Sequence, residues 1–532
     1  MKVLDVAQAR TCFLNVANAG KKHGRGLWFM QQAVLPIART RKPAPTATFL
    51  FNRQLAEIPW LPCALSMLSR GLWWPSLTCY SFIHFLSSFF CLLASAHQKS
   101  LLWCVPFHLS LMPRKASFRP ASASAASPVQ TLLSPLHGLP ILVKDLIGTF
   151  DQMDTTGGQT YAAYYEEQDP SGSSSGSAVA ADLGLAFATL GTETSGSIIL
   201  PAEKSNIVGI KPTVGLTSRY MVVPVSERLD TIGPMARTVR DAALVLQAIA
   251  GQDANDNYTS TSPFQTGVPE YAAACDMAGL QGKRIGIPRN VLEALFRIRQ
   301  GVASPILSSF EKAVETIRDA GATIIGDANF TAYESYLKSD APSRVIAADI
   351  LSGFATYLSE LSSNPNNIHG LEDIRKYTQR SAEEDYPARN TQQWDMALFA
   401  GINNSSPDFW PLYQQSLCFG EEGGLLGALA RHNLDAVVLP SSLASDIPSI
   451  VGTPVVTVPF DSFPANMSVL YNGRGDLVDA APGIPLGISF LGPRWSEESL
   501  IAMAYAFEQR TAARDRLSRV IEPLTELQDI LS

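Results

Sequence analysis

Short apolar runs alternate with stretches of helical period through the chain after residue 130. Such runs, bounded by glycine or polar residues, are typical of buried strands. They lie at 139–143, 186–191, 284–287, 322–325, 436–439, 455–458 and 486–491. Helical patterns fall near 177–182, 239–250, 306–320 and 497–510. This alternation predicts an α/β fold, with a mixed, mainly parallel central sheet covered by helices.

Several helix boundaries can also be read from the residues. Thr238 followed by Asp241 is a capping pattern, and Gly321 is placed to end the helix before it. Ser496 with two glutamates after it favours the start of the last helix, because carboxylates stabilise a helix N-terminus.

A segment of different composition comes before this region. Residues 1–125 hold 14 Lys and Arg against 2 Asp and Glu, so a basic arm of net charge +12 precedes a body of −19. We therefore predict an arm without a recognisable domain at 1–130 and one domain at 131–532. The body has two cysteines, Cys275 and Cys418, which is no disulfide framework and fits the cytoplasm.

The arm contains a segment with two interpretations. Residues 71–98 carry no Asp, Glu, Lys or Arg, and 76–96 is long enough for a bilayer, which takes about 20 apolar residues. A membrane anchor is the alternative reading, which would allow membrane association. Serines, a threonine and His84 dilute the run, so a poorly folded arm is the preferred expectation.

The candidate catalytic residues are concentrated in 171–202, a segment rich in serine and glycine around an Ala-rich helical pattern. Glycine at the ends of a helix and a strand lets the backbone aim several serines and bare N–H groups at one point. Upstream, Lys144 follows the apolar run 139–143, which predicts a buried lysine. Burial lowers the pKa of a lysine, and a neutral amine can take a proton from a serine hydroxyl.

These pieces resemble the amidase signature family, serine hydrolases with a Ser-Ser-Lys triad. The matching motifs are HGLPILVKD at 137–145, GSSSGS at 172–177, GTETSGSI at 191–198, PA at 201–202 and VGIKPTVGLTSR at 208–219. The likeness covers about three quarters of the chain and thins between 255 and 430. Residues 1–130 have no counterpart.

The resemblance implies a role for each matching residue. Ser197 would be the nucleophile, Ser173 the bridging serine with a cis peptide, and Lys144 the base. Backbone N–H groups at Thr194, Ser195 and Gly196 would form the oxyanion hole. The implied reaction is hydrolysis of a small-molecule carboxamide to an acid plus ammonia or an amine, through an acyl-enzyme on Ser197 and without a cofactor.

The chain departs from the family pattern in two places. Ile199 stands where many members have arginine. Ser173 lies 29 positions after Lys144, whereas the family normally places a helix and a strand between them, so an internal deletion is indicated. The lost packing predicts doubtful activity, and a catalytically inactive amidase-like scaffold is the alternative.

Other classes of function fit the sequence less well. Residues 172–176 satisfy the nucleophile elbow of α/β-hydrolases, with Ser174 at its tip and His369 or His432 as base, but 165–170 does not resemble the strand that an elbow requires. The glycine-rich loops lack the ending of a phosphate-binding loop. No metal-ligand spacing is present, and the acidic body argues against nucleic acid as a partner. The sequence does not predict an oligomeric state.

Overall fold

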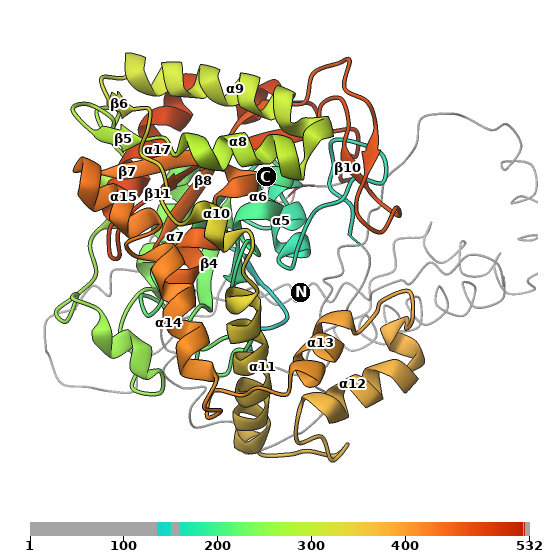
Figure 1. Ribbon diagram of the computed structural model, residues 1–532. Helices are drawn as coiled ribbons and strands as arrows, with labels where there is room; N and C mark the ends of the chain where they lie inside the picture. Colours follow the sequence, from blue (N-terminus) through green and yellow to red (C-terminus); the bar gives the residue numbers. More distant parts are fainter. Residues whose placement is uncertain (1–135, 150–159, 525, 527–532) are drawn as a thin grey trace, which may run out of the picture. The chain divides into compact units, whose positions relative to one another are not determined.

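A nine-stranded sheet organises the part of the chain that the computed structural model describes, residues 136–149, 160–524 and 526 (Figure 1). The predicted arm at 1–130, including the apolar segment 76–96, lies outside the described residues. The boundary proposed at residue 131 stays a prediction.

The sheet has the strand order β1-β2-β4-β3-β8-β11-β7-β5-β6. A separate hairpin pairs β9 with β10. The strands are β1 (Ile141–Val143), β2 (Ala188–Glu193), β3 (Val208–Lys211), β4 (Thr231–Ala236), β5 (Arg284–Gly286), β6 (Thr323–Ile325), β7 (Ala436–Pro440), β8 (Val455–Ser462), β9 (Leu470–Tyr471), β10 (Val478–Ala480) and β11 (Pro485–Leu491).

The predicted mixed sheet is confirmed, with its parallel pairs at the two ends. The pairs β1–β2, β7–β5 and β5–β6 are parallel. The five pairs between β2 and β7 are antiparallel, so antiparallel neighbours outnumber parallel ones, unlike the mainly parallel sheet expected. Two of the antiparallel pairs, β3–β4 and β8–β11, join strands whose connections contain no crossover helix, so the chain returns antiparallel beside itself.

Helices cover this sheet and extend beyond it. They are α5 (Ser175–Asp182), α6 (Ile199–Lys204), α7 (Val239–Ile249), α8 (Arg289–Ile298), α9 (Gln300–Asp319), α10 (Tyr333–Tyr336), α11 (Ala341–Glu360), α12 (Leu371–Arg380), α13 (Gln392–Ala400), α14 (Phe409–Gly420), α15 (Leu425–His432), α16 (Asp446–Val451) and α17 (Glu497–Thr511). Helix α5 packs on β2, α6 packs on β8 and β11, α7 packs on β4, and α17 packs on β8.

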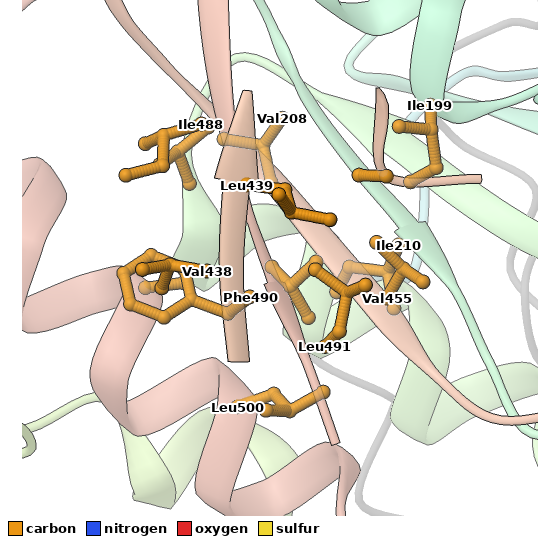
Figure 2. Packing of buried hydrophobic residues seen from close by; sticks show 14 of the residues in the cluster. Ile199, Val208, Ile210, Val438, Leu439, Val455, Ile488, Phe490, Leu491 and Leu500 are labelled. Atoms are coloured by element: carbon orange, nitrogen blue, oxygen red, sulfur yellow. The ribbon is translucent and has the colours of Figure 1, made fainter. Parts of the chain in front are cut away.

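The main apolar core lies between the sheet and these helices. Figure 2 shows Phe490 and Leu491 of β11 in the same cluster as Leu500 of α17 and Ile199 of α6. A smaller cluster, which includes Phe354, joins α11, α12 and α13 with their connecting loop. Helices α11–α13 therefore have a core of their own.

The seven predicted strands and four predicted helices are all present, with ends that shift by a few residues. Thr238 caps α7 by accepting the Asp241 N–H at 3.1 Å, as predicted. Ser496 precedes α17, but its hydroxyl donates to the Pro493 carbonyl instead of capping. Glu497 is buried and accepts the Thr213 N–H at 2.6 Å, so it joins α17 to the segment after β3.

Two kinds of feature have no instance in the described ranges. No helix there is long and apolar enough to cross a bilayer. No group of three or more His, Cys, Asp or Glu side chains there could hold a metal ion.

Candidate active site

Lys144 follows β1 directly, and the strand carries it into the protein. Its side chain is 2% exposed. The Nζ atom donates to Ser173 Oγ at 2.7 Å and to Ser174 Oγ at 3.1 Å, and the Thr192 carbonyl accepts at 3.4 Å. The predicted buried lysine is confirmed, and it lies against residues 171–176, which we call the Gly/Ser loop.

Burial changes the acidity of this lysine. Loss of solvation lowers the pKa of Lys144 from 10.5 to about 7, although the negative charges of Asp230, Glu193 and Asp145 oppose the shift. Burial disfavours the charged form of an amine, so a large share of the lysine is neutral near physiological pH. A neutral amine in hydrogen-bond contact with a hydroxyl can act as a proton acceptor.

The Gly/Ser loop carries two serines to this amine. The Gly172–Ser173 peptide bond is cis, as the resemblance implies. Ser174 is fully buried at the start of α5, and its hydroxyl lies 3.1 Å from the Thr192 carbonyl. Ser175 donates to the Ser171 carbonyl at 2.6 Å, which is a turn-forming contact. The loop is therefore packed against β2.

Residues 194–197 form the turn between β2 and α6, which we call the nucleophile turn after the role that the resemblance implies for Ser197. Gly196 has φ +83°, a conformation that favours glycine. The Ser197 carbonyl accepts the Ser174 N–H at 3.1 Å, which joins the nucleophile turn to the Gly/Ser loop. Among the described residues, the Ser197 hydroxyl has no hydrogen bond.

Three carboxylates hold the nucleophile turn. Glu193 accepts the N–H groups of Gly196, Ile198 and Ile199 at 2.8, 2.6 and 2.9 Å. The hydroxyl of Thr194 donates to Asp230 at 2.5 Å, and that of Ser195 donates to Asp446 at 2.9 Å. The turn is thus held by Glu193, which directly precedes it, and by carboxylates from two later segments of the chain.

The N–H groups of the turn differ in whether they are already hydrogen-bonded. Glu193 engages the Gly196 N–H, whereas those of Thr194, Ser195 and Ser197 donate to no protein acceptor in the described part of the chain. Ile199, the departure from the family pattern, is fully buried in the main core.

The structure brings the predicted base and bridging serine into contact although they are 29 positions apart. Residues 150–159 of that connection lie outside the described ranges, and β1 pairs with β2 in register at Val143 and Leu190. Lys144 is therefore not drawn away from Ser173. The predicted nucleophile, Ser197, is connected to this pair through the backbone bond from the Ser174 N–H.

The nucleophile-elbow alternative does not fit the described structure. No strand precedes Ser174 directly there, and its hydroxyl is enclosed by Lys144 and Thr192. His369 lies in the loop before α12 with Asn367 as its side-chain partner, and His432 ends α15. Neither histidine contacts Ser174.

Comparison with known proteins gives the family. The family model described as Amidase matches residues 155–501. The chain belongs to the amidase family. A protein of Arthroderma benhamiae, whose name places it among the amidases without stating a substrate, is 48% identical over 75% of each chain.

Other relatives differ in activity. A chain of the glutamyl-tRNA(Gln) amidotransferase of Ligilactobacillus salivarius is 30% identical, covering 64% of this chain and 67% of its own. The crystal structure of peptide amidase from Stenotrophomonas maltophilia aligns with a TM-score of 0.60 and 30% identity, over 72% of this chain and 84% of that one. Membership supports amide hydrolysis as the general activity.

The sequence alone did not reveal two carboxylates that hold the nucleophile turn of this amidase, Asp230 and Asp446. Their hydroxyl partners, Thr194 and Ser195, are 36 and 251 positions away. The one signal in the sequence is that Asp230 lies in LDTIGP, inside the region of resemblance.

Proposed function

We propose that this amidase hydrolyses carboxamides through an acyl-enzyme on Ser197, with Ser173 as the proton bridge and Lys144 as the base. The observation that carries the proposal is the 2.7 Å hydrogen bond between Lys144 Nζ and Ser173 Oγ, made by a lysine whose pKa burial lowers to about 7. A serine hydroxyl needs such a neighbour to become a nucleophile.

The reaction follows from these positions. As Ser197 Oγ attacks the carbonyl carbon, its proton passes to Ser173 Oγ while the Ser173 proton passes to Lys144 Nζ. The C–N bond then breaks, and the leaving nitrogen takes the proton back through the same relay. Water attacks the acyl-enzyme in the second half, giving the carboxylic acid and regenerating Ser197.

The free N–H groups of the nucleophile turn suit the developing oxyanion. In this proposal Thr194 and Ser195 donate to it, together with Ser197, and each such donor is typically worth about 3–4 kcal/mol. Gly196 contributes differently from the expectation, because its N–H is engaged by Glu193 and its φ of +83° shapes the turn.

The substrate class in this proposal is a small molecule with a linear amide. Peptide amidase is a structural relative, so peptide amides belong among the first compounds to test. The free thiols Cys275 and Cys418 fit a reducing compartment, and we place the enzyme in the cytoplasm on that ground.

The test is covalent labelling of the full-length protein with a fluorophosphonate, which reacts with activated serines. We expect labelling of the wild type, none of Ser197→Ala, and slower labelling of Ser174→Ala. Turnover of a panel of carboxamides, followed by ammonia or amine release, should disappear with Ser197→Ala as well. A cooperatively folded wild type that neither labels nor turns over any amide would support the inactive scaffold instead.

A further inference from the structure

The first turn of α6 has a gap in its backbone hydrogen bonds. The Leu200 N–H donates to the Gly196 carbonyl at 2.9 Å, and the Ala202 N–H donates to the Ile198 carbonyl at 3.0 Å. The bond between these two would run from residue 201 to the Ser197 carbonyl. Residue 201 is proline, which has no N–H, so this helical bond cannot form.

The carbonyl left over by the proline belongs to the proposed nucleophile. It accepts the Ser174 N–H at 3.1 Å, a bond from the Gly/Ser loop. Ser174 is fully buried and Pro201 is buried, so solvent is a poor substitute for either partner. A buried N–H without an acceptor is costly, which makes this bond a constraint on the fold.

We propose that Pro201 is a positioning residue: by withholding an N–H, it reserves the Ser197 carbonyl for the Ser174 amide and so holds the Gly/Ser loop against the nucleophile turn. This inference rests on the proposed function of Ser173 and Ser197. Proline also suits the first turn of a helix, because its φ is already helical.

The bond reaches the proton relay through one residue. Ser174 follows Ser173 directly, and both hydroxyls accept from Lys144 Nζ, at 3.1 and 2.7 Å. The position of the Ser174 backbone therefore sets where Ser173 and Lys144 lie relative to Ser197. Within the described ranges, no other backbone hydrogen bond joins residues 171–174 to the nucleophile turn.

An N–H at position 201 would compete for the same oxygen. With alanine at this position, the backbone hydrogen bonds of α6 could continue without a gap. The N–H of residue 201 would then approach the Ser197 carbonyl along the helix axis. Sharing the acceptor weakens the Ser174 bond. The loop is then free to drift from the turn, and small displacements of reacting groups are expensive in rate.

The experiment compares Pro201→Ala with the wild type in the full-length protein. We expect kcat to fall about ten-fold while KM stays within about two-fold, because the variant alters the relay and not the substrate pocket. The melting temperature should change little, since the helical bond that alanine completes offsets the weakened Ser174 bond and the lost rigidity of proline. The matched control is Pro305→Ala inside α9, which likewise adds a helical N–H and should leave kcat unchanged.

A second measurement reads the bond itself. Residue-resolved hydrogen exchange should show faster exchange of the Ser174 N–H in Pro201→Ala, with the later amides of α5 unchanged. An unchanged kcat overturns the proposal, and so does a lower kcat without faster exchange at Ser174. If Ser197→Ala kept full turnover, the proposed function would fail, while the exchange at Ser174 would still report on the link.

Discussion

Asp230 holds a hydroxyl of the nucleophile turn, and its charge acts on Lys144. Its partly buried carboxylate accepts the Thr194 hydroxyl at 2.5 Å and the N–H groups of Val225 and Ser226 at 2.8 and 2.9 Å. Burial raises the pKa of Asp230 to about 6, and these hydrogen bonds limit that rise. Above pH 6 it therefore carries a charge that favours the protonated form of Lys144.

Replacing Asp230 by asparagine should move the pH dependence of the reaction to lower pH. The charge of Asp230 raises the pKa of Lys144, so its removal lowers that pKa, and the neutral base appears at a lower pH. We expect the rising limb of kcat/KM, near pH 7 in the wild type, to shift by about one unit. Asparagine can still accept from Thr194 through its amide oxygen.

The pH profile of kcat/KM between about pH 5 and 9 brackets the pKa of this base and checks the shift, with Asp446→Asn as the matched control. Asp446 also holds a hydroxyl of the turn, at Ser195, but is not among the charges that shift Lys144. The rising limb of kcat/KM for Asp446→Asn should stay at the pH of the wild type. A shift of the Asp230→Asn limb to higher pH would contradict the assigned sign.

The site was predictable from the sequence where the residues are close together or carry a motif. Lys144 after an apolar run and Ser173 in the Gly/Ser loop were both predicted, and the structure brings them into contact. Asp446 could not be predicted, because 251 residues separate it from Ser195 and a lone surface carboxylate has no local signature.

Close packing between β2 and α5 depends on a missing side chain. A Cβ at Gly191 would lie 2.8 Å from Ser174 Oγ and 3.0 Å from Ile198 Cγ1. Both neighbours are fully buried and have little room to move. Glycine here allows the helix that begins with the Gly/Ser loop to lie directly on the strand.

The variant Gly191→Ala should therefore lower both stability and activity. Overpacking in a core typically costs about 1–3 kcal/mol of stability. The added methyl group would also displace the Ser174 hydroxyl, which accepts a hydrogen bond from Lys144. Urea unfolding followed by circular dichroism measures the first effect, and fluorophosphonate labelling measures the second. Gly326→Ala is the control, because open space surrounds its Cβ position; an equal loss of stability in the two variants would count against the packing argument.

Predicting strands from the sequence succeeded where the apolar run was continuous and missed β3, β4, β9 and β10, of which β4 shows the reason best. This strand is buried throughout but contains Gly233 and Pro234, residues that argue against a central strand. It is tolerated because Pro234 pairs with Leu190 on the β2 side, while the β3 ladder covers only Met235 and Ala236. Tertiary pairing therefore overrode the local preference.

At the scale of the molecule, α6 joins the site to the sheet through a buried carboxylate. Glu203 accepts the Gly487 N–H of β11 at 3.0 Å, across 284 positions of sequence. Burial raises the pKa of Glu203 from 4.5 to about 7. The folded protein therefore holds this proton more tightly than the unfolded chain does.

This coupling predicts how Glu203→Gln changes stability with pH. A carboxyl whose pKa rises on folding loses stabilising effect as pH increases from its unfolded value to its folded one, here between about 4.5 and 7. Glutamine has no such proton and keeps an acceptor for Gly487. We expect the variant to be more stable than the wild type by roughly 1–3 kcal/mol at about pH 8, with a much smaller gain at about pH 5.

Urea unfolding at the two pH values measures the difference. Glu360→Gln is the control, an exposed glutamate at the end of α11, and should show the same pH trend as the wild type. If the stability gain of Glu203→Gln is no larger at the higher pH than at the lower one, the linkage is refuted.

The packing of α6 on β8 and β11 has a consequence for synthesis of the enzyme. All three residues of the proposed triad have been translated by residue 197, but the strands on which α6 packs, β8 and β11, begin only at residue 455. Asp446, which steadies Ser195, also arrives late. A nascent chain therefore carries the three residues of the proposed triad long before the strands that support α6 have been made.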